Sequence, residues 1–556
     1  MMENNEGLTG AQLLVQCLQN LGVKNSFGVP GESYLAVLDA LHDADIQFTL
    51  CRQEGAASFA ACAWGKLTGM PGICFVTRGP GATNGSIGVH SARQDSSPMI
   101  LFVGQVGVDH KDREAFQEVD YRAFFGPLAK WATEIDNAER IPEVVSRAWR
   151  LALSGRPGPV VIGLPEDMLT TRTSVEPCQP IEVAEAGVDL SQAEALRGIL
   201  NEAERPLILI GGGGWKEVGK SALQKFAELH NFPVSAIFRY HDLIDNNSPV
   251  YVGDAGVGMA AHLAEMIKNS DLILAINARL GEAATQSWSL LKVPYPRQKL
   301  VHVHASDKEI GKIYQPHLSF HANPNQFAQF LESLEISGQN LHHRTTWMAQ
   351  GHSDYLSSLI APPQNSPVDM SAVMKILQDR LEPDAILTNG AGNFAFWPNK
   401  HFCFGPRHRL LAPQSGAMGY GLPAAIAAAL AYPDRQVVCF AGDGDLQMGL
   451  AELGTAVQHG ARMVILVLNN GAYGTIRMHQ ERKYPSRVSG TNLHNPDFAA
   501  VAEAFGMKGF CVRQTEDFAE AFEQASESKT GALLELIVSV EAITPRKTIA
   551  DLRSGG

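Results

Sequence analysis

Short apolar runs alternate with longer segments of helical length along most of the chain. Near the start, β-rich runs at residues 26–29, 46–51, 72–76 and 99–103 are separated by alanine-rich segments. Strands that alternate with helices predict parallel sheets with crossover connections. The same alternation returns twice further along the chain. The pattern therefore predicts an α/β protein of three doubly wound parallel-sheet domains.

Two stretches lack a regular apolar period, and we interpret them as linkers. Residues 174–190 are rich in Glu, Pro and Val, and residues from about 335 to 369 carry clusters of His, Ser, Gln and Pro. The predicted domains are residues 1–180, 190–335 and 370–545. The middle one opens with an apolar run and the turn 211–214, an order typical of a Rossmann-like unit.

Composition narrows the class of protein. The 556 residues suffice for three or four domains, and the net charge of -13 provides no basic field for a nucleic-acid partner. No apolar run is long enough to span a membrane, so we expect no membrane partner. Residues 1–7 lack the apolar core of a signal peptide. We interpret the eight cysteines as reduced core residues of a cytoplasmic protein, since no CxxC pair occurs. They are Cys17, Cys51, Cys62, Cys74, Cys178, Cys403, Cys439 and Cys511.

The segment 436–480 is the most informative for chemistry. Its pattern predicts a buried strand at 437–441, a Gly442-Asp443-Gly444 turn, a helix at 446–459 and a second strand at 462–468. With a right-handed crossover, Asp443 and Asn470 then emerge at the carboxyl ends of strands in one sheet.

Oxygen donors at such an edge suit Mg²⁺. A carboxylate, an amide and a main-chain carbonyl are hard ligands, and glycines beside Asp443 allow a diphosphate to approach the backbone. Either motif alone is more often an ordinary turn. In combination the two are specific.

A second carboxylate, Glu54, follows the apolar run 48–52 and starts the small-residue segment 54–61. A helix packed on all sides is an unusual place for an acid. Without further context, Glu54 would be a helix-starting residue that complements the helix dipole.

These segments resemble the thiamine diphosphate enzymes typified by acetolactate synthase and pyruvate decarboxylase. Gly442-Asp443-Gly444, followed after 24 residues by Asn469-Asn470, is similar to the diphosphate motif of that family, and 52–57 is similar to its activating-glutamate segment. Further similar segments lie, in the family's order, at 27–31, 77–84, 116–118, 155–160 and 415–423.

The resemblance implies pyrimidine-binding, central and diphosphate-binding domains, in that order. It implies that Asp443, Asn470 and the main-chain oxygen of Ala472 bind Mg²⁺, and that Glu54 hydrogen-bonds to the cofactor's pyrimidine ring. The implied catalytic residues are Glu54, Gln117 and Gly31. The implied cofactor-binding residues are Glu54, Pro80, Asn84, Gly392, Asn393, Gly416, Met418, Gly442, Asp443, Gly444, Asp445, Asn470, Ala472, Tyr473 and Gly474.

The implied activity is a transferase or lyase reaction, the decarboxylation and carboligation of a small 2-keto acid, with pyruvate to acetolactate as the leading case. A 2-keto acid decarboxylase, a C–C lyase, an acetyltransferase and a non-catalytic cofactor-binding homologue stay open. Four positions depart from the pattern of acetolactate synthases that serve biosynthesis. Asn393 replaces Gln, Phe394 replaces His, Asp445 stands where a small or hydroxyl residue is common, and His479 replaces the tryptophan that shapes 2-ketobutyrate selection. Of the other histidines, His90 and His110 are weaker candidates for acid–base roles.

In the central domain, the 211–214 turn and Asn277-Ala278-Arg279 resemble FAD or ADP sites of relatives, but 253–259 departs from the segment that contacts FAD. FAD or ADP is an open alternative, and an empty nucleotide fold is favoured. The resemblance also implies a homodimer or homotetramer with active sites shared between subunits.

Overall fold

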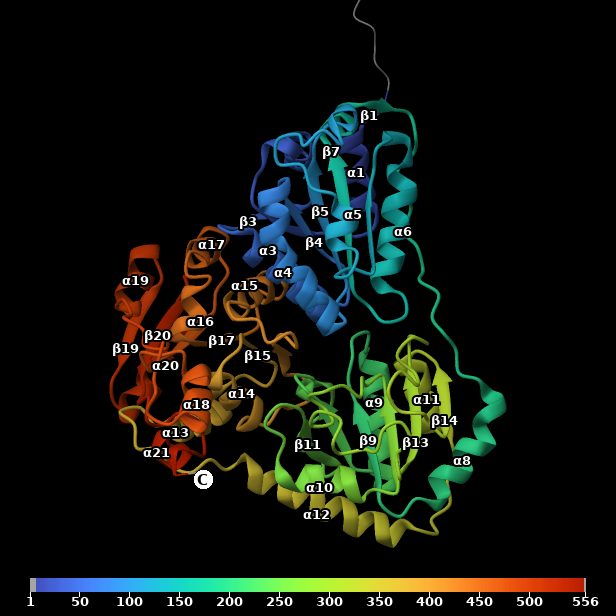
Figure 1. Ribbon diagram of the computed structural model, residues 1–556, viewed down its shortest axis with the longest axis vertical. Helices are drawn as coiled ribbons and strands as arrows, with labels where there is room; N and C mark the ends of the chain where they lie inside the picture. Colours follow the sequence, from blue (N-terminus) through green and yellow to red (C-terminus); the bar gives the residue numbers. More distant parts are fainter. Residues whose placement is uncertain (1–6, 555–556) are drawn as a thin grey trace, which may run out of the picture.

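The computed structural model describes residues 7–554, which form three α/β units (Figure 1). Each unit surrounds one six-stranded sheet, and all strand pairs within these sheets are parallel. Three parallel-sheet domains confirm the predicted fold class. Residues 1–7, which were predicted to contain no signal peptide, lie outside the described residues except for Gly7.

The first sheet has the strand order β3-β2-β4-β5-β7-β6, and a two-stranded sheet of β1 and β8 lies beside it. The elements are β1 Leu8–Thr9, α1 Gly10–Asn20, β2 Asn25–Gly28, α2 Leu35–His42, β3 Gln47–Leu50, α3 Glu54–Thr68, β4 Gly72–Val76, α4 Gly79–Asp95, β5 Met99–Gln105, α5 Tyr121–Phe125, β6 Trp131–Glu134, α6 Ile141–Leu153, β7 Pro159–Pro165, α7 Glu166–Thr170 and β8 Arg172–Thr173.

The central sheet has the order β11-β10-β9-β12-β13-β14, which corresponds to 3-2-1-4-5-6 along the chain. This is the strand order of dinucleotide-binding folds. The elements are α8 Ala193–Glu202, β9 Pro206–Ile210, α9 Glu217–His230, β10 Val234–Ile237, β11 Tyr251–Ala255, α10 Ala261–Asn269, β12 Leu272–Ile276, β13 Lys299–His304, β14 Leu318–His321, α11 Pro324–Ser333 and α12 Leu341–Leu359.

The third sheet has the order β16-β15-β17-β18-β20-β19. Numbered within each sheet, the strands of the first and third sheets share the order 2-1-3-4-6-5, so the two outer domains have one topology. The elements are α13 Met370–Arg380, β15 Ile386–Asn389, α14 Phe396–Lys400, β16 Arg409–Leu411, α15 Gly421–Ala431, β17 Val437–Gly442, α16 Asp443–Gln447, α17 Glu452–Gln458, β18 Val464–Asn469, α18 Gly474–Lys483, α19 Phe498–Phe505, β19 Lys508–Val512, α20 Phe518–Ser526, β20 Ala532–Ile537 and α21 Ile549–Arg553.

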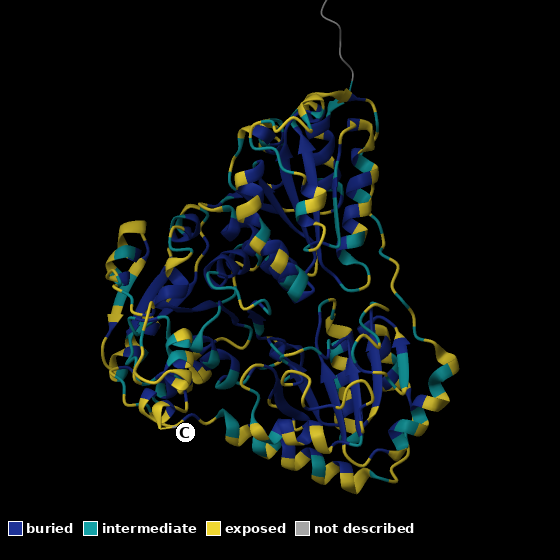
Figure 2. Ribbon diagram, viewed as in Figure 1, coloured by how far each residue is buried: buried dark blue, intermediate teal, exposed yellow. Residues whose placement is uncertain are grey.

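The outer domains share one hydrophobic core. Helices α3 and α15 are both rich in alanine, and they pack directly against each other with almost every residue buried (Figures 1 and 2). Small side chains let the two backbones approach closely, which explains why neither helix has a polar face.

Three sequence predictions were wrong in the second half of the chain. The predicted second linker contains the 19-residue helix α12, which packs on β11 and α10. The predicted helix 446–459 is two short helices, α16 and α17, because residues 448–451 form turns around Gly449. Asp443 is also the first residue of α16 and does not lie in a turn. The exact domain boundaries stay predictions.

All eight cysteines are free thiols, and six of them are buried. Cys403 is half-buried and Cys511 is exposed, so the core prediction was wrong for these two. Cys511 belongs to β19, the edge strand of its sheet, and is exposed there.

Candidate active site

One cluster of polar residues lies at the carboxyl ends of β15, β17 and β18, which are neighbours in the third sheet. Asp443 follows β17 and is only 3% exposed. Its Oδ1 accepts a hydrogen bond from the Gly444 amide at 2.9 Å, and its Oδ2 accepts one from Asn495 Nδ2 at 2.7 Å. Burial raises the pKa of the Asp443 carboxyl, and the bond from Asn495 opposes that effect.

Asn470 and Ala472 form a tight turn directly after β18. Asn470 Oδ1 accepts a hydrogen bond from the Ala472 amide at 3.0 Å, and Gly471 between them has a φ of 65°. A Cβ at Gly444 would lie 2.5 Å from Tyr473 Cε1, so this position admits only glycine. The structure thus gathers Asp443, Gly444, the turn 470–472 and Tyr473 at one edge of the sheet, with Gly474 starting α18.

Asp445 holds two loops of the same cluster together. Its buried Oδ1 accepts hydrogen bonds from the amides of Ala391 at 3.2 Å and Gly419 at 3.0 Å. Burial raises the pKa of Asp445 to about 7. These bonds anchor the loop that contains Gly392 and the loop that contains Met418, so Asp445 positions both.

Asn393 and Phe394 contact protein groups. Asn393 Nδ2 donates to the Ile543 carbonyl at 2.8 Å, and Thr475 donates to Asn393 Oδ1 at 2.9 Å. The Phe394 ring lies against Gly442, where a Cβ would be 2.7 Å from the ring. Gly416 is exposed, with a φ of 66°.

A second cluster lies at the carboxyl ends of strands in the first sheet. Glu54 begins α3, and its Oε2 accepts a hydrogen bond from Asn84 Nδ2 on α4 at 2.9 Å. The Gln117 carbonyl accepts a hydrogen bond from the Gly79 amide at 3.0 Å, which places Gln117 beside Pro80 at the start of α4.

Gly31 joins this cluster through Thr77. A Cβ at Gly31 would lie 2.5 Å from Thr77 Cβ, and a Cβ at Gly81 would lie 3.6 Å from Glu54 Oε1. Gln117 has a φ of 65°, a backbone conformation that a non-glycine residue adopts at a cost and that recurs at functional sites.

Within the described part of one chain, no polar contact joins the two clusters. Among residues 7–554, no hydrogen bond or ion pair joins Glu54, Pro80 or Asn84 to the Asp443 cluster. Other segments link the first and third domains: α3 packs on α15, Ser91 Oγ lies 2.9 Å from Ser415 Oγ, and Glu452 on α17 accepts a hydrogen bond from the Arg52 amide at 2.9 Å.

Each cluster is bordered by exposed apolar side chains. Phe116 is 76% exposed and Ile87 is 42% exposed near the first cluster, and Met448 and Ile476 are more than half exposed near the second. Large exposed apolar groups beside a polar cluster are typical of a surface that another chain covers.

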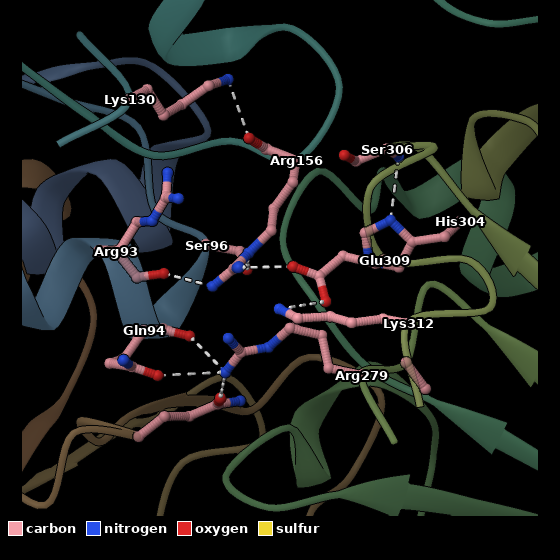
Figure 3. Close-up of polar contacts among 12 residues, drawn as sticks. Arg93, Gln94, Ser96, Lys130, Arg156, Arg279, His304, Ser306, Glu309 and Lys312 are labelled. Carbon is pink, nitrogen blue, oxygen red and sulfur yellow. Dashed lines mark hydrogen bonds and ion pairs between the residues drawn. The ribbon is translucent and has the colours of Figure 1, made fainter. Parts of the chain in front are cut away.

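A cavity of about 850 Å³ lies where the central domain meets the two outer domains. Arg279 donates from Nη2 to Gln414 Oε1 and to the Gln94 carbonyl, each at 3.1 Å, and Arg156 pairs with Glu309 at 2.9 Å (Figure 3). Lys312 also faces Glu309, at 3.6 Å. Arg279, Glu309 and Lys312, which line this cavity, therefore each contact another protein group.

The glycine turn that resembles a nucleotide loop does not line this cavity. A Cβ at Gly213 would lie 2.2 Å from the Ser96 carbonyl oxygen, and one at Gly212 would lie 2.5 Å from the Asn277 carbonyl oxygen. Close packing against Ser96 and Asn277 therefore explains why these positions are glycine, and a bound nucleotide is not needed to explain them.

The fold and the two clusters define the class: a multidomain α/β protein with polar clusters at the carboxyl ends of two sheets of equal topology. The sequence matches three family models, described as the N-terminal, central and C-terminal domains of thiamine pyrophosphate enzymes, at residues 8–124, 193–332 and 390–536.

Curated relatives cover nearly the full chain. The acetolactate synthase large subunit of Parasynechococcus marenigrum is 32% identical over 96% of this chain and 88% of the relative. The acetolactate synthase isozyme 2 large subunit of Escherichia coli is 29% identical over 96% of both chains. The isozyme 1 large subunit of the same organism is 30% identical over 96% of this chain and 94% of the relative. The chain belongs to the acetolactate synthase-like family of thiamine diphosphate-dependent enzymes.

The residues fit the cofactor of this family. Asp443 is a buried carboxylate with no Lys or Arg partner among the described residues, which suits a bound cation. The described residues contain no group of three His, Cys, Asp or Glu side chains that could hold a metal. A site here therefore depends on one carboxylate with amide and carbonyl oxygens, a donor set that Mg²⁺ accepts.

Sequence reasoning missed Asn495 and Thr475. Asn495 donates to both Asp443 and Asn469, and Thr475 donates to Asn393. No local pattern in the sequence points to Asn495, because it lies in an irregular segment 52 residues after Asp443.

The described helices include none long and apolar enough to cross a membrane.

Proposed function

We propose that this protein decarboxylates a small 2-keto acid with thiamine diphosphate and Mg²⁺ and joins the remaining fragment to an acceptor, with pyruvate to acetolactate as the leading reaction. The observation that carries this proposal is the coexistence of the Glu54–Asn84 pair with the buried Asp443 beside the 470–472 turn. A homologue that only bound the cofactor would not need Glu54.

Thiamine diphosphate, when bound, supplies the carbon nucleophile and the electron sink that decarboxylation requires. Asp443, Asn470 and the Ala472 carbonyl would hold Mg²⁺ against the diphosphate, and Asp443 is already oriented by Asn495. Asn84 fixes Oε2 of Glu54, which leaves Oε1 to hold or accept a proton at the pyrimidine ring.

Gln117 and Gly31 would border the substrate. The backbone of Gln117 is held in place, because its carbonyl accepts a hydrogen bond from the Gly79 amide. The side chain of Gln117 therefore remains available to a ligand. Gly31 lies against Thr77 and lets a small keto acid approach the backbone. Both residues thus serve in orienting and selecting the substrate.

A complete site requires a second copy of the chain. The Glu54 and Asp443 clusters lie in separate parts of one chain, and each is bordered by exposed apolar residues, so we propose a homodimer that can pair into a homotetramer. The partner's diphosphate domain would cover the Glu54 cluster. We further propose a cytoplasmic location, in keeping with the free thiols, and no nucleic-acid or membrane partner.

The central domain is proposed to work without FAD or ADP. Support comes from the contacts that Arg279, Glu309 and Lys312 make in its cavity and from the glycine turn that packs on Ser96. Purified protein should then lack the flavin absorbance near 450 nm, and acid-released material should contain no adenine nucleotide. A stoichiometric flavin or ADP would overturn this part of the proposal.

The deciding experiment incubates purified protein with thiamine diphosphate, Mg²⁺ and pyruvate, and measures both CO₂ and acetolactate. The Glu54→Gln variant serves as the blank. Matched CO₂ and acetolactate above that blank support carboligation. Release of CO₂ without acetolactate would favour a decarboxylase, and no consumption of pyruvate would refute pyruvate as the substrate.

A further inference from the structure

The segment between β8 and α8 is anchored to the first domain at one point. Residues 174–189 contain no helix or strand, and from residue 174 to 195 the one buried side chain is Cys178, which is 8% exposed. This segment connects the first domain to the central domain (Figure 1).

The anchor consists of contacts with helix α1. The Cys178 amide donates to Cys17 Sγ at 3.2 Å, and Asn20 Nδ2 donates to the Cys178 carbonyl at 3.0 Å. Cys178 Sγ also lies 3.9 Å from the Cys17 carbonyl oxygen. Two thiols that are 161 residues apart in the chain are therefore held side by side.

The surroundings of the two thiols shift their pKa values in opposite directions. A hydrogen bond from Cys17 lowers the pKa of Cys178 to about 7, and the Ser146 hydroxyl on α6 acts in the same direction. The same bond, together with burial, raises the pKa of Cys17. Cys178 therefore has the lower pKa of the two thiols, and Cys17 lies beside it.

Among the described residues, the other six cysteines have neither a hydrogen-bonded cysteine neighbour nor a lowered pKa. No other two cysteines of residues 7–554 share a hydrogen bond, and burial raises the pKa of all six remaining thiols. Cys178 therefore combines a lowered pKa, which favours reaction with an oxidant, with a second thiol in direct contact.

We propose that Cys17 and Cys178 are a redox pair that forms a reversible disulfide with a small peroxide as oxidant, and that this bond fastens the interdomain segment to α1. The Cys178 thiolate attacks one peroxide oxygen, the O–O bond breaks, and hydroxide leaves, so that Cys178 becomes a sulfenic acid. Cys17 then attacks the Cys178 sulfur and displaces the sulfenic oxygen, which leaves as water with the proton of Cys17. In total, two thiols and one hydrogen peroxide give one disulfide and two waters.

The test uses the holoenzyme, treated with a small molar excess of hydrogen peroxide and then with an alkylating agent. After alkylation under denaturing conditions, we expect the oxidised wild-type chain to carry two fewer alkyl groups than the unoxidised control, and peptide mapping to identify a Cys17–Cys178 disulfide that dithiothreitol reverses. Cys178→Ser should not form it, whereas the control Cys511→Ser should form it like the wild type.

A nick between the two cysteines provides a second readout. Glu176 is exposed and precedes Cys178, so a glutamate-specific protease that cuts there separates the cysteines into two fragments. Oxidised, nicked wild type should run as one band without reductant and as two bands with it. The thermal midpoint of the oxidised wild type should also rise by roughly 5 °C.

Three results would overturn the proposal. They are a cross-linked peptide that lacks either cysteine, oxidation of Cys178 to sulfinic acid with no disulfide, and an unchanged thermal midpoint after complete disulfide formation. The mass and mapping measurements on the wild type do not depend on whether a variant folds. A Cys17→Ala variant, with its fold checked by circular dichroism, should accumulate the sulfenic acid of Cys178.

Discussion

Asn84 donates a hydrogen bond from Nδ2 to Oε2 of Glu54 at 2.9 Å, and this bond joins the start of α3 to the second turn of α4. One carboxylate oxygen is thereby fixed by the protein, and the other points toward the small residues at the start of α4. A glutamate held in this way suits a role in proton transfer.

Replacing Glu54 by Gln should separate cofactor binding from turnover. The amide keeps the shape of the side chain and can still contact Asn84, but it cannot hold the transferable proton. We expect thiamine diphosphate affinity within a few-fold of wild type and activity lower by roughly 10²- to 10⁴-fold. Isothermal titration and a steady-state assay measure the two quantities. Glu143→Gln, on the exposed side of α6, is the matched control, and wild-type turnover by Glu54→Gln would refute the proposed role.

Asp443 and Asn495 should differ in how they affect metal binding. Asp443→Ala removes the charged ligand, so binding of Mg²⁺ and thiamine diphosphate should be lost. Asn495→Ala keeps the carboxylate but removes the hydrogen bonds to Asp443 Oδ2 and Asn469 Oδ1, so Mg²⁺ affinity should fall by roughly 10- to 100-fold. A magnesium titration followed by activity and cofactor retention distinguishes the two. Asp434→Asn, exposed in the same domain, should change neither.

The sequence predicts the buried strands, and the position of Asp443 and Asn470 directly after two of them, because both depend on local patterns. Buried parallel strands are continuous apolar runs, and Asp443 and Asn470 directly follow two of them. Helix α12 escaped prediction because its buried stripe consists of Arg344, Met348, Gly351 and Tyr355. Only two of these four residues are large and apolar, so the helical period is hidden.

Contacts that join distant irregular segments could not be predicted either. Asn495 reaches Asp443 from a segment with no regular structure, and Asn393 is fixed by Thr475 and by the Ile543 carbonyl. Such contacts depend on how loops fold over the edge of the sheet, which no periodicity encodes.

Glu481 should stabilise the C-terminal helix in a pH-dependent manner. Its buried carboxylate accepts hydrogen bonds from Arg553 on α21, both at 2.8 Å, and from Arg477 on α18 at 3.0 Å. The bond from Arg553 is the main cause that lowers the pKa of Glu481 from 4.5 to about 2. Because the folded state favours the charged carboxylate, this stabilisation is complete above pH 4.5 and is lost as the pH falls toward 2.

We therefore expect Glu481→Gln to lower the thermal midpoint by roughly 3 °C, because a hydrogen-bonded ion pair is replaced by a neutral amide. The difference from wild type should be constant from about pH 8 to pH 5.5 and should shrink below pH 4.5. Differential scanning fluorimetry at several pH values measures it. Glu523→Gln, which breaks an exposed pair with Arg380, should have little effect. A difference that grew on acidification would contradict this account.

Mixing two inactive variants should restore activity if the sites are shared between subunits. In a hybrid dimer of Glu54→Gln and Asp443→Ala chains, one site combines both defects and the other combines an intact Glu54 with the partner's intact diphosphate domain. Random reassortment makes half of the dimers hybrids, and each has one working site. The mixture should then reach about a quarter of wild-type activity.

The variants are first dissociated together and then reassembled with thiamine diphosphate and Mg²⁺, and sedimentation velocity confirms dimers or tetramers. Each variant reassembled alone should stay inactive, which excludes reversion. If both clusters of one site came from the same chain, every site would carry a defect and no activity would return. Ile87→Asp provides an independent check, since a charge on the exposed apolar border of the Glu54 cluster should weaken association. That variant should dissociate at protein concentrations where the wild type is still dimeric, and it should lose activity in proportion.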